Sequence, residues 1–505
     1  MDTSGGPMPP GPAVTVGVAA SGCADRARPG LALTLMVTAQ FMVILDAAIV
    51  NVALPTIQRS LSFSAVGVQG AITAYATAFG GVLILGGRLC DLFGARRMFL
   101  AGLTAFGVTS LACALATSPV FLVVARAAQG LGAGLLAPAA LALLTTTFTE
   151  GAARNRALGM FGVATSLGFA SGQVLGGVLT DTLGWRAVFL INVPVAVVTL
   201  LLARKAVRPD GPPARRQVPD VAGAVLITAA IAIMVWAPTQ GARDGWDSAG
   251  FLVPLLASLA LLIVFGIVET RLRNPLVRLS ILQSRWLAGA NFATAVTGAL
   301  NGAVVLLCGL FLQQAHGYTP LQAGLSFLPT GLAGLVAGAR AAGPLITRLG
   351  TRTVLTGAGV VSAAMIAGLS FLAGNGNYLP LLGWLVGIGA SFTTAAVATT
   401  VAASSGVARH EQGMAAGLRQ TSFQLGVALG VAVFLSVAAS HTGALLAPGS
   451  RLSHTQALTA GFRLSLQALS GLSLLGAIVT WAALRGKPST PAATAPAAAD
   501  ASSSS

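Results

Sequence analysis

The chain has 505 residues, of which 55 % are hydrophobic and only 8 % are charged, whereas an ordinary soluble protein is about 25 % charged. Together with a mean hydropathy of +0.83, this excludes a soluble enzyme or a disordered protein and indicates a polytopic membrane protein. The net charge of +16 comes from basic residues in short gaps between apolar runs, which favours the positive-inside rule over nucleic-acid binding.

Fourteen apolar runs are long enough, or nearly so, to cross a hydrocarbon core of about 30 Å, so we expect an all-α membrane protein with 14 transmembrane helices. They lie between two low-complexity tails, residues 1–30 and 486–505, which we expect to be disordered and cytoplasmic. The expected spans are residues 31–54, 65–87, 98–117, 119–144, 157–180, 187–203, 221–237, 249–268, 287–312, 321–344, 354–373, 379–403, 421–440 and 465–484.

The charges of the expected loops alternate from one side of the membrane to the other. With the N-terminus inside, the cytoplasmic segments and helix ends carry 21 Lys/Arg residues and the outer segments carry five. This asymmetry follows the positive-inside rule and supports an even number of spans with both termini cytoplasmic. We expect the protein to lie in the plasma membrane.

A weak internal repeat relates the two ends of the chain with an offset of 256 residues. The matching pairs are Gly87 with Gly343, Gly94 with Gly350, and Arg96 with Arg352. The offset maps span 1 onto span 9, so two related six-helix halves enclose two inserted helices. The expected parts are a first half at 31–203, a cytoplasmic linker at 204–220, two inserted helices at 221–268, and a second half at 269–485.

Two ionisable residues lie deep in the expected spans, the acid Asp46 in span 1 and the base Arg126 in span 4. Counted from the outer ends of their spans at 1.5 Å per residue, their depths are about 13 and 10 Å, so the two could pair. Charge is costly in a membrane and often functional. In one interpretation Asp46 exchanges protons or meets a cationic substrate while Arg126 modulates it; in the other the pair only joins two helices.

The cytoplasmic loop after span 2 carries a group of glycine and charged residues. Gly87 precedes it, and Gly94 permits a tight turn between helices. Asp91 can bond Arg96 or Arg97, or bind the positive N-terminus of span 13 as a latch. The alternative interpretation is a solvated charged turn.

Glycines four residues apart in span 5, at Gly168, Gly172 and Gly176, followed by Gly177, predict a flat strip that lets another helix approach closely.

Motifs typical of ATP-driven pumps and of enzymes are missing from the sequence. No phosphate-binding loop is present, so an ATP-driven pump is not indicated. No paired acids or metal-ligand cluster suits an enzyme, and the four cysteines form no CxxC pair, so we expect no metal and no cofactor.

Several ordered motifs resemble those of the fourteen-span drug:proton antiporter branch of the major facilitator superfamily, over residues 31–484. The motifs are residues 45–55 in span 1, 87–97 in the first cytoplasmic loop, 126–130 in span 4, 184–194 at the start of span 6, 311–329 in the second half, and 413–432 in span 13.

The resemblance implies roles for particular residues. Asp46 would be the acid that couples protons to substrate, Arg126 would take part in proton transfer, and Asp91 would latch the outward-facing state. The span 5 motif departs from the family pattern, because Gln173 follows Gly172 where proline is usual. By the repeat offset Gly302 stands opposite Asp46, so proton coupling would depend on the first half alone.

We therefore expect a secondary transporter, driven by the proton gradient, that exports small amphipathic compounds such as drugs or antibiotics by alternating access. It would act in the lipid bilayer as a monomer, without ATP or nucleic acid. Polar candidates for its substrate cavity are Gln40, Asn51, Gln313 and Gln314. Two alternatives stay open: a metabolite or lipid transporter with different coupling, and a polytopic membrane enzyme.

Overall fold

The computed structural model describes residues 29–64, 67–148, 152–207, 210, 221–271, 284–372, 378–405, 412–446 and 452–485. Within these ranges every regular element is helical, and thirteen helices are long and apolar enough to cross a membrane. The expected span 65–87 overlaps α2 (Gly70–Phe93), which is not among these thirteen helices. The count of fourteen transmembrane helices therefore stays a prediction. The expected tail 486–505, the expected tail 1–30 except Pro29 and Gly30 of α1, and most of the linker lie outside the described residues.

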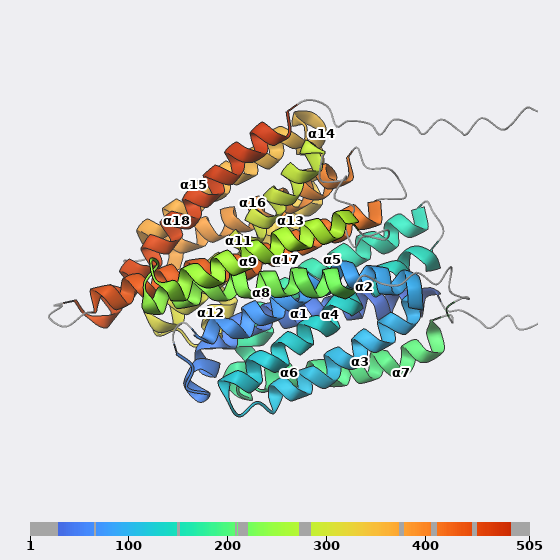
Figure 1. Ribbon diagram of the computed structural model, residues 1–505, viewed down its shortest axis with the longest axis horizontal. Coiled ribbons are helices and arrows are strands. Elements are labelled where there is room, and N and C mark those ends of the chain that lie inside the picture. Colours follow the sequence, from blue (N-terminus) through green and yellow to red (C-terminus); the bar gives the residue numbers. More distant parts are fainter. Residues whose placement is uncertain are drawn as a thin grey trace, which may run out of the picture.

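The first six expected spans fall on one group of packed helices (Figure 1). A 3₁₀ turn, η1 (Gly67–Gln69), leads into α2, and the expected span 187–203 is divided at Ile191. The other helices of this group are α1 (Pro29–Ser60), α3 (Ala95–Ala114), α4 (Pro119–Thr147), α5 (Ala152–Thr182), α6 (Ala187–Leu190) and α7 (Asn192–Ala206). We call this group the first bundle.

The second bundle also contains an interrupted helix. The expected span 321–344 is divided at two places. The helix α13 begins just after Phe327 with Pro329 in its first turn, and α14 begins after a π-helical turn with Pro344 in its first turn, where the missing backbone N–H of proline is tolerated. The elements are α11 (Arg285–Gln314), α12 (Pro320–Ser326), α13 (Leu328–Val336), η2 (Ala337–Ala342), α14 (Gly343–Leu349), α15 (Thr351–Leu372), α16 (Tyr378–Ser404), α17 (Gln412–Leu445) and α18 (His454–Ala483).

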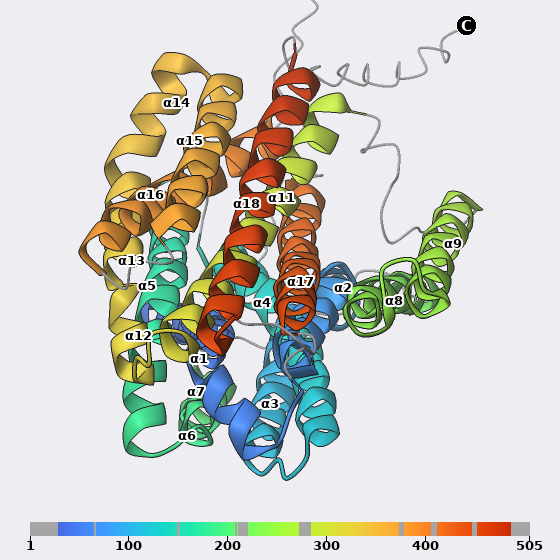
Figure 2. The same ribbon diagram turned by 90° about the vertical axis from the view of Figure 1, so that its left-hand side faces the viewer.

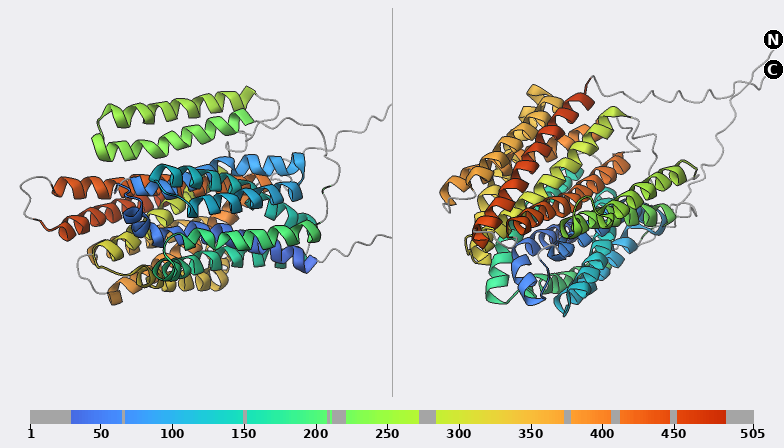
Figure 3. Two further views of the ribbon diagram at one scale, coloured as in Figure 1. Left: turned by 90° about the horizontal axis from the view of Figure 1, so that it is seen from below. Right: turned by 60° about the vertical axis from the view of Figure 1, so that its left-hand side comes forward.

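Two helices, α8 (Val221–Asp244) and α9 (Ala249–Arg271), form a hairpin beside the bundles rather than within them (Figures 2 and 3). Ile231 and Val235 of α8 pack against Ala76 of α2 and Ala428 of α17. The outer helix α9 leaves large apolar side chains uncovered, including Ile263 at 64 % exposure. In a membrane protein such a surface contacts lipid. The two helices overlap residues 221–268, and the division of the chain into two related halves stays a prediction.

The start of α1 and the end of α18 lie at the same end of the molecule, which we call the terminal face, and α1 ends at the opposite face (Figure 3). The sequence repeat has a structural counterpart at the terminal face. Arg96 Nη2 donates to the carbonyl of Arg204 at the end of α7 (2.7 Å), and Arg352 Nε donates to the carbonyl of Trp481 near the end of α18 (2.9 Å). The glycine two residues before each arginine has a positive φ, +95° and +79°.

Candidate functional site

Asp46 and Arg126 lie side by side inside the first bundle, on α1 and α4. Asp46 Oδ2 and Arg126 Nη1 are 2.6 Å apart, and the two side chains are 0 % and 1 % exposed. Taking both charges out of water is expensive, and their attraction repays this cost only when further hydrogen bonds satisfy the remaining atoms. The stability of the ion pair therefore depends on the hydrogen bonds that its other atoms make.

The second carboxylate oxygen, Asp46 Oδ1, accepts two hydrogen bonds. One comes from Gln129 Nε2 on α4 (2.9 Å) and the other from Asn192 Nδ2 at the start of α7 (2.7 Å). Gln129 Nε2 also donates to Ser110 Oγ on α3 (2.7 Å), and its Oε1 accepts from Arg126 Nη1 (2.6 Å). The carboxylate thus connects α1 to α3, α4 and α7 through buried side chains.

The guanidinium of Arg126 is held by backbone and aromatic groups as well as by the carboxylate. Its Nε donates to the carbonyl of Ala71 on α2 (2.9 Å). Its central carbon lies 4.2 Å from the ring centre of Tyr75 and 5.7 Å from that of Phe189, distances at which the face of a ring attracts a cation. Loss of the negative charge on Asp46 would leave Arg126 with only neutral partners.

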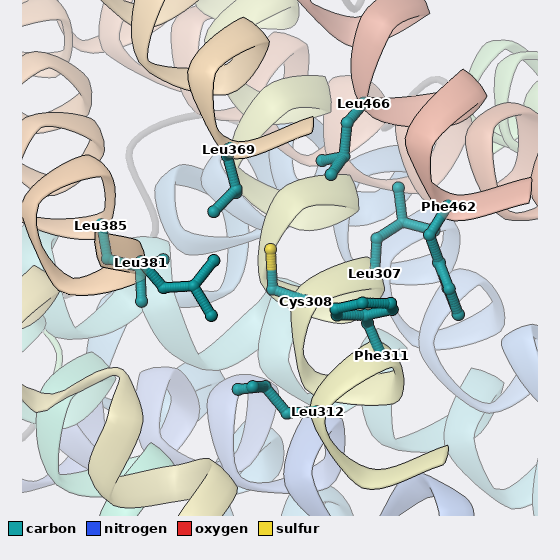
Figure 4. Close-up of a pocket in the computed structure, with 9 residues that line it drawn as sticks. All are labelled: Leu307, Cys308, Phe311, Leu312, Leu369, Leu381, Leu385, Phe462 and Leu466. Carbon is teal, nitrogen blue, oxygen red and sulfur yellow. The ribbon is translucent and has the colours of Figure 1, made fainter. Parts of the chain in front are cut away.

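The second bundle has no charged counterpart of this site in its described residues. Ser362 Oγ donates to Ser391 Oγ (2.9 Å) where α15 meets α16, and both side chains are buried. Gly302, which the repeat offset places opposite Asp46, packs against Val427 of α17. Between α11, α15, α16 and α18 lies a cavity of about 20 Å³ lined by apolar side chains and the thiol of Cys308 (Figure 4). Among the described residues, the buried acid–base pair is thus confined to the first bundle.

The loop motif between α2 and α3 binds a residue that the sequence does not single out, Asp210. Its two carboxylate oxygens accept from the backbone N–H groups of Arg96 (2.9 Å) and Arg97 (3.0 Å) at the start of α3. Gly94 makes this approach possible, because a Cβ there would lie 2.1 Å from the Asp210 carboxyl carbon. Gly87 has open space around it. The Asp91 side chain lies outside the described residues, so the expected latch stays a prediction.

The glycine strip of α5 lies directly on α1. A Cβ on Gly168, Gly172 or Gly176 would come within 3.0 Å of α1 atoms, the nearest being the Ile49 carbonyl at 2.7 Å from Gly176. Gly177 faces the other way, where a Cβ would lie 2.6 Å from the Leu321 Cα of α12. The strip therefore provides one close contact within the first bundle and one between the bundles.

Gln173 lies in the same part of α5 and is 1 % exposed. Neither its Nε2 nor its Oε1 has a hydrogen-bond partner among the described residues. Its backbone carbonyl faces Gly324 of α12, where a Cβ would lie 2.3 Å from the oxygen. An amide buried without partners is energetically costly, and this one lies at the contact between the bundles.

The four polar cavity candidates do not form one cluster. Gln40 Nε2 donates to Thr165 Oγ1 of α5 (3.2 Å), and Asn51 is half-buried on α1. The two glutamines at the end of α11 instead join the bundles near the opposite face: Gln313 Nε2 donates to the Val52 carbonyl (3.2 Å), and Gln314 Nε2 donates to Gln58 Oε1 (3.4 Å).

Two further contacts connect the bundles near the opposite face. The backbone N–H of Leu321 donates to Asp181 Oδ2 at the end of α5 (3.0 Å). Gln69 Nε2 donates to Ser436 Oγ of α17 (3.3 Å). With the glutamines of α11, they hold the two bundles together at this end of the molecule.

A family model described as Major Facilitator Superfamily matches residues 36–431. The chain belongs to the major facilitator superfamily. Relatives include the cephamycin export protein of Amycolatopsis lactamdurans, 38 % identical over 84 % of this chain and 87 % of that protein. The puromycin resistance protein of Streptomyces alboniger is 35 % identical over 89 % of this chain and 90 % of that protein. A tetracenomycin C resistance and export protein of Streptomyces glaucescens is 34 % identical over 83 % and 77 %.

Solved structures show that this superfamily member shares its fold with distant transporters. A bacterial homologue of the human lysosomal transporter Spinster, inward-facing and unoccupied, matches with a TM-score of 0.66 at 14 % identity, covering 90 % of this chain and 96 % of that one. The POT family transporter PepTSo matches with a TM-score of 0.65 at 13 % identity, covering 90 % of this chain and 97 % of that one. The chain is a multi-pass membrane transporter and not an enzyme.

Within this member of the superfamily, the sequence analysis missed two polar partners of Asp46, Gln129 and Asn192, and the serine that Gln129 also binds, Ser110. Two of them lie inside motifs that the sequence shows, Gln129 in residues 126–130 and Asn192 in residues 184–194. Three residues separate Arg126 from Gln129, which places both on one face of α4. Ser110 has no such signal, because a serine in an apolar helix is common. A second buried acid, Glu269, lies near the end of α9, just beyond the expected span 249–268.

Proposed function

We propose that this transporter exports small amphipathic compounds in exchange for protons, by alternating access. The buried Asp46–Arg126 pair carries the proposal, because it is a titratable group whose charge state is tied to contacts among four helices. The export and resistance activities named for the antibiotic-producing relatives supply the direction and the substrate class.

In the proposed cycle, protonation of Asp46 removes the negative charge that Arg126 requires. The Oδ1 contacts with Gln129 and Asn192 weaken at the same time, since a neutral carboxyl group is the poorer acceptor. α1 is then free to change its packing against α4 and α7. Release of the proton restores the ion pair, so the two charge states favour two arrangements of the same helices.

The movement proposed is a rocking of the two bundles. Contacts at the opposite face, such as Leu321 to Asp181 and Gln313 to Val52, would break as the bundles part there. The glycine strip would let α1 shift against α5, because no side chain of Gly168, Gly172 or Gly176 interlocks with α1. The substrate would bind between the bundles near the bilayer midplane, with Gln40 and Asn51 within reach.

The same proposal places the protein in the plasma membrane as a functional monomer, with both termini cytoplasmic. The proton gradient is its energy source, and no ATP or cofactor is needed. Arginine and lysine in the cytoplasmic loops support this orientation.

The test uses inside-out vesicles with an imposed proton gradient and a panel of neutral, cationic and anionic dyes and antibiotics. Uptake and gradient dissipation are followed together for the wild type, for Asp46→Asn and for Asp247→Asn, an exposed acid in the α8–α9 turn. We expect gradient-dependent uptake in the wild type and in Asp247→Asn, and its loss in Asp46→Asn. Robust uptake that ignores both the gradient and the Asp46 substitution would overturn the antiport proposal and favour a facilitator or a transporter coupled to another ion.

A further inference from the structure

A groove of about 500 Å³ runs between the start of α11 and the end of α18 at the terminal face. Its apolar walls are formed by Ala288, Gly289, Phe292, Ile478, Val479 and Ala482. Arg285 lines the same groove. The groove thus combines apolar walls with a cationic group, and these two features complement an amphipathic ligand.

Small residues create the groove. A Cβ on Gly289 would lie 2.7 Å from the Cβ of Ala483, so the two helices approach closely there. Beside this contact Phe292 is 39 % exposed and Ile478 is 65 % exposed. Inside a bilayer, apolar surface of this kind is covered by hydrocarbon chains.

Three arginines lie at or next to the groove, and the second bundle has almost no acid to neutralise them. Arg485 follows the end of α18, and Arg352 bonds the carbonyl of Trp481, which lies between the wall residues Val479 and Ala482. Residues 284–485 contain nine arginines and a single carboxylate, Glu411. No ion pair with a carboxylate of the described residues involves Arg285, Arg352 or Arg485. Charge complementarity therefore favours an anion at this rim.

Aromatic contacts locate the rim at the depth of lipid headgroups. The guanidinium of Arg352 lies 3.5 Å from the ring centre of Trp481, and that tryptophan is 41 % exposed. Tryptophan and arginine side chains at helix ends are typical of the membrane–water interface. The groove therefore has arginines without carboxylate partners at headgroup depth and apolar walls deeper in the bilayer. A phospholipid has its phosphate and its acyl chain at the same two depths.

We propose that this groove binds an anionic glycerophospholipid, with an acyl chain along α11 and α18 and the phosphate beside Arg285. The site lies in the second bundle, away from the Asp46 pair, and the proposal does not depend on what is transported. A basic pocket between transmembrane helices is suited to such headgroups.

The test measures lipid retention by the full-length protein with native mass spectrometry. Purified protein is stripped of lipid in detergent and mixed with phosphatidylglycerol or phosphatidylcholine of identical acyl chains. The wild type is expected to retain phosphatidylglycerol in preference to phosphatidylcholine. Arg285→Gln should lower this preference by about fivefold, the factor for about 1 kcal/mol per basic residue at an anionic surface.

Two further variants separate the groove from general charge effects. Arg243→Gln removes an exposed arginine from the last turn of α8 at the opposite face and should leave the preference unchanged. Ala288→Phe fills the groove without changing charge and should reduce retention of both lipids. Thermal unfolding in lipid-free detergent shows whether each variant is folded. An unchanged preference in folded Arg285→Gln, or an equal loss in Arg243→Gln, would overturn the proposal.

Discussion

Asp46 and Arg126, 80 residues apart in the chain, meet across the α1–α4 contact with 2.6 Å between Oδ2 and Nη1. Both are almost completely buried, and the acid has two further donors, Gln129 and Asn192. Such a cluster stabilises the fold only while both charges are present. Loss of either charge would leave the other one buried without its partner.

We predict strong non-additivity between substitutions of this pair. Asp46→Asn or Arg126→Gln alone leaves the other member uncompensated and should destabilise the protein by about 3–5 kcal/mol. The double variant should be less destabilised than the sum of the two, because it leaves no unpaired charge. Thermal unfolding of the four proteins in detergent measures the effect, and simple additivity would show that the two side chains are not energetically coupled.

Gln173 and Gln313 offer a matched comparison at the contact between the bundles. Gln173 is buried without a partner, whereas Gln313 donates across the contact to Val52. Gln173→Leu should raise thermal stability, by about 1–3 kcal/mol, because it removes an unsatisfied amide. It should also slow uptake, since it favours the arrangement closed at the opposite face. Gln313→Leu should lower stability, and the same sign for both variants would contradict this account.

Gly94 and Gly350 share a positive φ, but only Gly94 faces a carboxylate. Gly350→Ala should cost only backbone strain, about 1–3 kcal/mol. Gly94→Ala should cost more, because its Cβ would also displace Asp210 from the N-terminus of α3. Melting temperatures of the two variants compare the costs. Addition of Asp210→Ala to each should remove the difference, and a persistent gap would show that Asp210 is not its cause.

The α5 strip predicts position-specific intolerance of side chains. Gly176→Val would bring a Cβ to within 2.7 Å of the Ile49 carbonyl, and such overpacking typically costs about 1–3 kcal/mol. Gly159→Val, on the same helix with open space around it, serves as the control. Unfolding temperature and gradient-driven uptake should both fall for Gly176→Val only. Equal effects would indicate a general response of α5 to β-branched residues.

Hydropathy alone predicts the helical membrane class, because a backbone in lipid has few ways to satisfy its polar groups. Asp46 and Arg126 could be found the same way, since a deep acid and a deep base are conspicuous among apolar residues. The interruption of the expected span 321–344 is harder to predict from the sequence, because a proline in a membrane helix does not always end that helix.

The polar side chains around the charged pair could not be predicted from hydropathy. Asn192 and Ser110 are neutral, and each is compatible with many positions on a membrane helix. Only tertiary packing brings Asn192 of α7 to the carboxylate and Ser110 of α3 to Gln129. Asp210 belongs to an arginine- and proline-rich linker by sequence, yet its carboxylate binds α3.

Sequence by itself thus determined the helical membrane class and which charged residues lie deep in apolar helices, because lipid imposes a cost on each residue independently of its neighbours. Tertiary structure decided whether a polar side chain is satisfied. Gln173 illustrates this: its departure from the family pattern is visible in the sequence, but its lack of partners depends on how α5 packs against α12. Hydrogen bonding requires two groups at the right distance, and only the packed helices set that distance.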